Sequence, residues 1–233
     1  MNAEMESKPI FIYFHIASMR YGTSIFKQIA KDIKTSGLDM AASEIHLSIV
    51  GVKKMRISLP GNVFIHENSN LQTGEFVTLK LLESHALLAP NGKFLYIHTK
   101  GITKYWNRPI RDWRKYMTFF MIQNFRRCIE ILDTCDACGV DLVDEPVRHF
   151  SGNFWWARGD YINSLPRIED ISSDRAEFIL TLRHNAEFWI GMGNGDLFSL
   201  WNSGIDVYKR HLIRYRSSNY IGINEIQGDS SNP

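Results

Sequence analysis

Residues 10–17, IFIYFHIA, form a run of branched and aromatic side chains that only one histidine interrupts. A run of this kind, without alternation of apolar and polar residues, is typical of a strand buried on both faces, as in a parallel sheet. Apolar residues three and four apart follow over 23–34, and Gly37 closes that stretch, which predicts an amphipathic helix. Because a buried strand followed by a helix begins a βαβ unit, the chain is expected to be an α/β protein.

The rest of the chain extends this pattern. Further strands are predicted at 45–51, 62–66, 93–98 and near 139–143, and helices at 75–89, from about Pro109 to Leu132, and over 176–193. No linker or repeat divides the sequence. The expected fold is therefore one Rossmann-like domain over residues 1–233, with a mixed, mainly parallel central sheet flanked by helices and with disordered tails at 1–9 and about 225–233.

Charge and composition restrict the class of partner. A net charge of +2 over 233 residues is too small for a protein whose affinity for nucleic acid or a membrane surface comes from phosphate neutralisation. The apolar run after the polar start is shorter than the core of a signal peptide or a spanning helix, so a soluble, cytoplasmic protein without a transmembrane segment is expected. Cys135 and Cys138 lack the second cysteine pair of a tetrahedral zinc site, so Cys128, Cys135 and Cys138 are interpreted as reduced structural thiols.

Polar residues follow the strands predicted at 10–17 and 93–98, at the carboxyl ends where open α/β sheets bind ligands. The residues concerned are His15, Ala17 and Ser18 on the first strand and His98, Thr99, Lys100 and Gly101 on the second. A lysine can pair with a phosphate, a hydroxyl can donate to one, and a glycine lets the backbone approach. This chemistry favours a diphosphate. The alternative is that His98 is a core histidine and Lys100 a solvated charge.

Two later segments carry further candidates. In HFSGNFWWA (149–157), Trp155 and Trp156 must point to opposite faces of a strand, so one of them could form a cleft wall, with His149 and Asn153 as sugar-binding donors. Burial of both tryptophans is the alternative. Glu187 lies amid Phe188 and Trp189, where desolvation would raise its pKa toward that of a general base; a solvated glutamate is the alternative.

The segments GEFVTLKLLESHA (74–86), YIHTKGITKYW (96–106), HFSGNFWWARGDYINSLP (149–166) and AEFWIG (186–191), in this order, resemble a family of small GT-A-like glycosyltransferases. The family includes the N-terminal domain of a large chlorella-virus glycan-building enzyme and bacterial and viral relatives. The resemblance implies transfer of a sugar from a nucleotide-diphosphate donor, expected to be a UDP-sugar, to a hydroxyl of a glycan acceptor. Most GT-A enzymes hold Mn²⁺ or Mg²⁺ with an Asp-x-Asp pair at the strand end where this chain has His98-Thr99-Lys100.

The missing carboxylates leave metal dependence open, with His98 as the candidate ligand, and let Lys100 and His98 be proposed as the groups that neutralise the leaving diphosphate. The resemblance further implies a base-stacking role for Tyr21 and a role for Glu187 as the base of an inverting reaction. It assigns the following residues to the binding of donor or acceptor: His15, Ile16, Ala17, Ser18, Glu75, Thr78, Gly152, Asn153 and one of Trp155 and Trp156.

Alternatives remain open for both the base and the function. Asp112, Asp141 and Asp144 compete with Glu187 as the catalytic carboxylate. A nucleotide-sugar-binding module without catalytic activity is the second functional hypothesis, since the Asp-x-Asp pair is missing. The third is a nucleic-acid-binding protein that uses the basic and aromatic residues at 100–116, and the small net charge counts against it.

Overall fold

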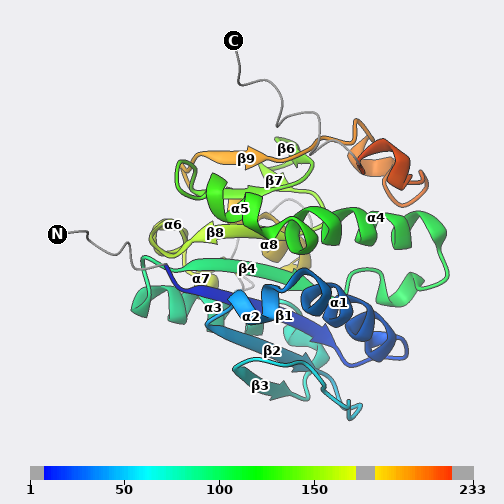
Figure 1. The fold of residues 1–233 in the computed structure, drawn as a ribbon, viewed down its shortest axis with the longest axis horizontal. Coiled ribbons are helices and arrows are strands. Elements are labelled where there is room, and N and C mark those ends of the chain that lie inside the picture. Colours follow the sequence, from blue (N-terminus) through cyan, green and yellow to red (C-terminus); the bar gives the residue numbers. More distant parts are fainter. Residues whose placement is uncertain (1–7, 172–181, 222–233) are drawn as a thin grey trace.

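The computed structural model of the protein describes residues 8–171 and 182–221. Its centre is a seven-stranded sheet with the strand order β3-β2-β1-β4-β8-β5-β9 (Figure 1). The strands are β1 (Ile10–Ala17), β2 (Glu44–Val50), β3 (Val63–Asn68), β4 (Lys93–His98), β5 (Ala137–Gly139), β8 (Trp155–Arg158) and β9 (Leu197–Ser199). A separate pair joins β6 (Leu142–Val143) to β7 (His149–Phe150).

Most neighbouring strands run parallel. β1 pairs in parallel with both β2 and β4, β2 with β3, and β5 with β9, whereas β8 is antiparallel to β4 and β5. The expectation of an α/β, Rossmann-like domain with a mixed, mainly parallel sheet is therefore confirmed. Since β1 and β4 are adjacent and parallel, with His15 opposite His98 in the register, their polar carboxyl ends meet at the same edge of the sheet.

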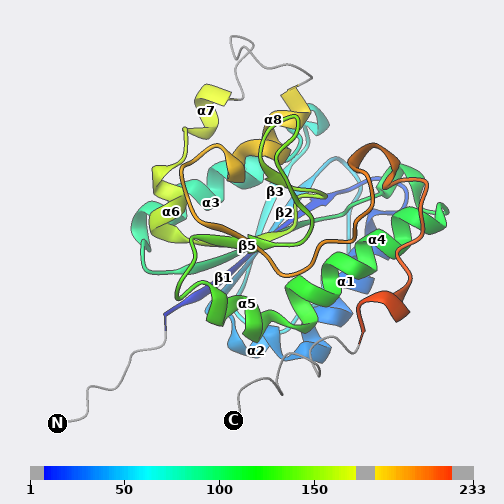
Figure 2. The ribbon, with the colours of Figure 1, turned by 90° about the horizontal axis from the view of Figure 1, so that it is seen from above.

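Helices cover both faces of the sheet, as Figure 2 shows from above. One layer contains α1 (Gly22–Ser36), α2 (Leu38–Ala41), α4 (Arg108–Thr118) and α5 (Phe125–Ile131); the other contains α3 (Phe76–Leu88), α6 (Gly159–Ser164), α7 (Ile168–Ile171) and α8 (Leu182–Phe188). Each layer has its own apolar core against the sheet. Strands buried from both sides explain why β1 and β4 read as nearly unbroken apolar runs.

The long helix predicted from Pro109 to Leu132 is interrupted. Between α4 and α5, residues Phe119–Gln123 form a π-helical turn, and the Asn124 amide donates to the Phe119 carbonyl 3.0 Å away, a five-residue hydrogen bond. One wide turn of this kind inserts an extra residue without removing the apolar face, so the apolar spacing alone did not indicate it.

Trp155 and Trp156 point to opposite faces of β8, as predicted, but both are buried. Trp155 is 1% exposed and packs in the core beneath α3, and Trp156 is 0% exposed and donates its indole N–H to the Met121 carbonyl. The idea that one of them forms a cleft wall is wrong, because helices cover both faces of the sheet at β8.

Part of the predicted helix at 176–193 lies outside the described residues; within them, α8 and a 3₁₀ turn at Trp189–Gly191 occupy its second half. The predicted tails at 1–9 and 225–233 fall mostly outside them as well. Cys128, Cys135 and Cys138 are free thiols. Among the described residues, no helix combines the length and the hydropathy that crossing a membrane would require.

Candidate active site

A pocket of about 480 Å³ lies at the carboxyl ends of β1 and β4. Among the residues that line it are His15, Ala17, Glu75, His98, Thr99, Lys100 and Gly101. These come from β1, β4, the loop after β4 and the residue before α3. Parallel neighbours end at the same edge, so the sequence-based expectation of a shared site at these two strand ends agrees with the position of this pocket.

Hydrogen bonds hold the ends of β1 and β4 together. The Thr99 amide donates to the His15 carbonyl at 3.0 Å, and the Ala17 amide donates to the Thr99 hydroxyl, also at 3.0 Å. His15 Nδ1 lies 2.8 Å from the hydroxyl of Thr78 on α3. Thr78 and Thr99 thus fix the strand ends and the helix against each other, and any contact with a ligand is additional to that role.

Two residues assigned to the loop after β1 face away from the pocket. Ile16 is fully buried in the core on the side of α1, because it alternates with His15 along the strand. Ser18 is also buried, and its hydroxyl donates to the Lys53 carbonyl. Neither residue lines the pocket, whereas His15 and Ala17 on the same strand do.

Glu75, immediately before α3, binds several polar groups at once. Its carboxylate accepts hydrogen bonds from the Tyr96 hydroxyl at 2.8 Å and the Asn153 amide at 2.7 Å, and lies 3.6 Å from His98 Nδ1. Burial favours the neutral form of Glu75, but His98, His15 and the Tyr96 hydroxyl outweigh it and lower the pKa. The structure thus presents an ionised carboxylate, 15% exposed, between strand and helix. Tyr96 belongs to this site but was not predicted from the sequence. Its position two residues before His98 on β4 places both side chains on the same face of the strand and could have indicated it.

His98 lies between the Gly152 carbonyl and the Glu75 carboxylate. Its Nε2 lies 2.9 Å from the Gly152 carbonyl, and its Nδ1 faces Glu75. Burial, only partly opposed by Glu75, lowers the pKa of His98, so the ring is neutral near pH 7. Since Nε2–H donates to the Gly152 carbonyl, Nδ1 is the ring nitrogen that carries the lone pair, and Glu75 is the carboxylate beside it.

Lys100 and Glu187 form an ion pair beside the pocket. The Nζ of Lys100 lies 3.4 Å from a Glu187 carboxylate oxygen and 4.4 Å from the centre of the Trp113 ring. The Gly152 amide donates to the same oxygen at 3.3 Å. Although burial alone would raise the pKa of Glu187, Lys100, His149 and His98 lower it to about 2. The expectation of a raised pKa is therefore wrong, because Lys100 and the two histidines that lower the pKa come from distant parts of the chain.

Two glycines permit this arrangement. Gly101 has φ of 81°, and a Cβ there would lie 2.3 Å from Ile110 Cγ2. Gly152 has φ of 100°, and a Cβ there would lie 2.4 Å from the Met117 sulfur. Both positions are in the left-handed region, and both lie too close to α4 for any other residue. The turns that place Lys100 and Glu187 side by side therefore require glycine.

Tyr21 is not free for stacking on both faces. Its ring stacks on Tyr105 with 4.6 Å between centroids, and its hydroxyl accepts from the Trp106 indole at 3.1 Å. Trp106, which is 71% exposed, is the open aromatic surface of this group. Lys104, two residues earlier, lines the pocket, so these rings lie next to its rim.

The other polar candidates do not reach the pocket. Asp112 pairs with Arg214, Asp144 pairs with Arg148 and is 87% exposed, and Asp141 is buried against Arg210. His149 Nδ1 lies 2.6 Å from the Val147 carbonyl, and its ring packs against Phe188. Glu187 is the only one of the four carboxylate candidates that contacts a residue of the pocket.

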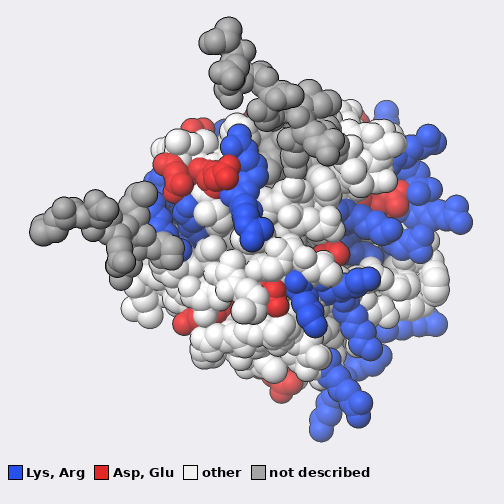
Figure 3. Space-filling model, viewed as in Figure 1, with Lys and Arg blue, Asp and Glu red and all other residues white. Residues whose placement is uncertain are grey.

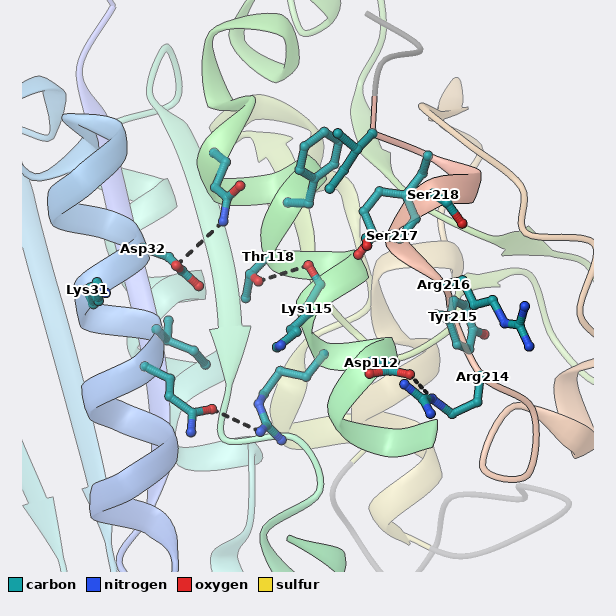
Figure 4. Close-up of a pocket in the computed structure, with 17 residues that line it drawn as sticks. Lys31, Asp32, Asp112, Lys115, Thr118, Arg214, Tyr215, Arg216, Ser217 and Ser218 are labelled. Carbon is teal, nitrogen blue, oxygen red and sulfur yellow. Dashed lines mark hydrogen bonds and ion pairs between the residues drawn. The ribbon is translucent and has the colours of Figure 1, made fainter. Parts of the chain in front are cut away.

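Two further pockets lie near this site. One of about 520 Å³ shares Leu71, Gly74 and Glu75 with it and is also lined by Ala186, the neighbour of Glu187. The other, of about 620 Å³, lies between α1, α4 and residues 214–221, and Figure 4 shows Asp112 paired with Arg214 at its rim.

Lys and Arg gather on the side of the molecule that carries α1 and α4 (Figure 3). Arg114 connects the regions, since it donates to both the Lys100 carbonyl and Gln28.

Residues 25–196 match the family model described as a domain of unknown function, DUF8361. The chain belongs to this family. No curated protein matches it. Within the DUF8361 chain, the matched stretch contains Glu75, the end of β4, the Gly152 turn and Glu187, whereas His15 and Ala17 precede it.

The buried His15 predicts a measurable pH dependence of stability. Burial, reinforced by His98 and opposed by Glu75, lowers its pKa from 6.5 to about 4. Between these values the unfolded state of the DUF8361 chain binds more protons at this residue than the folded state, so the free energy of unfolding falls as the pH is lowered. The expected loss is about 3 kcal/mol from pH 6.5 to pH 4.

Urea denaturation at a series of pH values measures this dependence. His15→Gln should flatten the dependence by that amount, and His211→Gln, which removes an exposed histidine, is the matched control. Equal slopes for His15→Gln and the wild type would contradict the assignment of this pH dependence to His15.

Proposed function

We propose that this DUF8361 protein is a glycosyltransferase that moves a sugar from a nucleotide-diphosphate donor, a UDP-sugar, to a hydroxyl of a glycan acceptor. The observation that carries the proposal is the Lys100–Glu187 pair at the carboxyl end of β4, beside a pocket of about 480 Å³. A cation and a carboxylate side by side are the two groups that sugar transfer from a diphosphate needs: one for the leaving group and one for the attacking hydroxyl.

In the proposed reaction, the acceptor hydroxyl attacks the anomeric carbon of the donor and inverts it. Glu187 takes the hydroxyl proton, the new C–O bond forms, and the bond between the anomeric carbon and the phosphate oxygen breaks. The electron pair of that bond leaves with the diphosphate, whose charge Lys100 neutralises. Thr99 and Gly101 favour close approach of the phosphates, as a fixed strand end followed by a glycine turn leaves room for them.

Donor binding would also prepare Glu187 as a base. In the structure, Lys100 is the first of the charged neighbours that lower the pKa of Glu187 to about 2, and a carboxylate with such a pKa is a poor proton acceptor at pH 7. When a diphosphate draws Lys100 away from Glu187, the positive charge that lowers the pKa of Glu187 is lost. Burial, which raises this pKa, then has the larger effect, and the pKa of the carboxyl rises. The same lysine therefore couples donor binding to activation of the base.

The residues at the pocket do not suit a bound Mn²⁺ or Mg²⁺. These ions prefer several carboxylate or carbonyl oxygens, but among the described residues that line the pocket Glu75 is the single carboxylate, and one of its oxygens already accepts from Tyr96 and Asn153. Among the described residues, the group with metal-ligand spacing is Glu44, His46 and His85, outside this pocket. No step of the proposed reaction is therefore assigned to a metal ion.

The neighbouring pocket of about 520 Å³ supports a place for the acceptor. It adjoins the first pocket at Leu71, Gly74 and Glu75, and Ala186 puts the backbone of α8 in its wall. An acceptor hydroxyl that entered from this side would approach the residue next to Ala186, which is the proposed base. Trp106, two residues after the pocket residue Lys104, offers an exposed ring for a nucleotide base.

A donor panel tests the proposal. The protein is incubated with nucleotide sugars that differ in base and sugar, the release of free nucleoside diphosphate is followed, and the melting temperature is measured with each donor. We expect one uridine donor both to raise the melting temperature and to be turned over. Stabilisation without turnover, with glycan acceptors present, would instead identify a binding module. The absence of both effects with every donor would refute the proposal.

A further inference from the structure

A second cluster of titratable side chains lies along α3 from the pocket. It consists of Glu44 and His46 on β2, His66 on β3 and His85 in the last turn of α3. His46 Nε2 lies 2.8 Å from a Glu44 oxygen, which in turn lies 4.0 Å from His85 Nε2. These residues are far apart in sequence, and parallel pairing of β2 with β3 and packing of α3 on the sheet bring them together.

The distances suit one small cation. One ligand atom from each of Glu44, His46 and His85 lies within 4.8 Å of the others. Ligands at about 2.0–2.2 Å from a tetrahedral Zn²⁺ lie roughly 3.3 Å from one another. The observed separations of 2.8 Å and 4.0 Å bracket that value. An ion could thus be received through small side-chain adjustments and without movement of the backbone.

Outer partners are already in place for both histidines. The Nδ1 of His46 lies 3.1 Å from His66 Nε2, and the Nδ1 of His85 lies 2.8 Å from the Tyr13 hydroxyl. When a histidine binds a metal through Nε2, its Nδ1–H usually donates to a second group that fixes the ring. Both rings have such a group on the side away from the shared centre, so their Nε2 atoms are the ones directed at it.

The ring of His46 is further held by its neighbours on the sheet. Tyr13 on β1 stacks on it with 4.5 Å between centroids and parallel planes, and Phe64 on β3 stacks with a separation of 5.0 Å. The side chains of His46, His85 and Glu44 are 11%, 18% and 30% exposed. The site is rigid on the protein side yet reachable from solvent, which allows an ion to enter and a water molecule to complete its coordination.

We propose that Glu44, His46 and His85 form a zinc-binding site that joins β2 to α3, with His66 and Tyr13 as hydrogen-bond partners of the two histidines. Two imidazole nitrogens and one carboxylate oxygen suit Zn²⁺, whereas Mg²⁺ and Ca²⁺ prefer sites made of oxygens alone. The site goes beyond the proposed sugar transfer, because none of its three ligands lines the pocket at the ends of β1 and β4.

The test is a zinc titration of the EDTA-treated, dialysed full chain, measured by calorimetry and by melting temperature. We expect one Zn²⁺ per chain and a raised melting temperature. Cobalt chloride should give the visible absorption of a tetrahedral or five-coordinate ion with nitrogen and oxygen ligands. Because zinc also binds thiols, the titration is repeated with Cys135→Ser, the partly exposed cysteine, which should bind zinc as the wild type does.

Variants identify the ligands. His46→Gln and Glu44→Gln should each abolish binding, and His66→Gln should weaken the affinity by about 10–100-fold, since it removes an outer partner only. His211→Gln is the control for the loss of a histidine elsewhere. If His46→Gln does not fold, Glu44→Gln, which keeps the shape of the side chain, decides the question. The proposal is overturned if the wild type does not bind zinc, or if Glu44→Gln binds it as tightly as the wild type.

Discussion

Lys100→Ala is expected to lower the rate of donor turnover by about 10²–10³-fold, the usual loss when a group that stabilises developing charge is removed. Lys100 pairs with the proposed base, with its Nζ 3.4 Å from the Glu187 carboxylate. In its absence the leaving diphosphate loses the positive group that lies beside the proposed base. The rate constant should fall more than donor affinity, because the charge on the leaving oxygen grows toward the transition state.

Two companion variants separate the charge of Lys100 from its position. Lys104→Ala removes a nearby lysine that also lines the pocket, and a small change in turnover is expected. Lys100→Arg keeps the charge and should retain more activity than alanine. The pH–rate profile of Lys100→Ala provides an independent readout, since Glu187 loses the first of the charges that lower its pKa. Wild-type turnover by Lys100→Ala would contradict the mechanism.

Arg210→Met is expected to lower the free energy of unfolding by about 3–5 kcal/mol, because it leaves a buried charge without its partner. Arg210 Nη1 lies 2.6 Å from an oxygen of Asp141, and the two side chains are 4% and 1% exposed. The two groups form an ion pair, but they are not oriented for a hydrogen bond. Asp141, with φ of 52°, also accepts from the Ser203 amide, so it fastens the segment after β9 to the end of β5.

A surface pair provides the matched control for this variant. Arg214→Met breaks the pair with Asp112, but the Arg214 side chain is 47% exposed, so a change of only about 0–1 kcal/mol is expected. Urea denaturation of both variants makes the comparison. The double variant Asp141→Asn with Arg210→Met should recover part of the loss, as it removes the stranded charge. Equal stabilities of the Arg210 and Arg214 variants would contradict this account.

The fold was readable from the sequence where burial is nearly complete. β1 and β4 carry unbroken apolar runs because helices cover both faces, and α1 ends at a glycine with φ of 75°. The strand ends that meet at the pocket followed from the same pattern. The interruption of the helix between α4 and α5 could not be predicted from the sequence, since a π-helical turn leaves the apolar face continuous.

The chemistry of the site was less readable, because it depends on contacts between distant residues. Sequence placed Glu187 among aromatic side chains and so predicted a raised pKa, whereas Lys100, which lies 87 positions earlier, reverses the direction. The partners of Glu75 come from β4 and from the turn before β8. The cluster of Glu44, His46 and His85 offered only one local sign: Glu44 directly precedes the strand predicted at 45–51, and His46 lies two residues further on, which puts both on one face of an extended chain.

The helix α3 joins both regions of the molecule. Glu75 precedes the N-terminal end of α3 and lines the pocket, and Thr78 in the first turn forms a hydrogen bond with His15. His85 in the last turn forms a hydrogen bond with Tyr13. Ten residues of helix separate Glu75 from His85, or roughly 15 Å. A helix resists compression, so an axial displacement at one end is transmitted to the other. A zinc ion bound by His85 and a nucleotide bound near Glu75 would therefore be coupled through α3. Thermodynamic reciprocity requires that each ligand change the affinity of the protein for the other by the same factor.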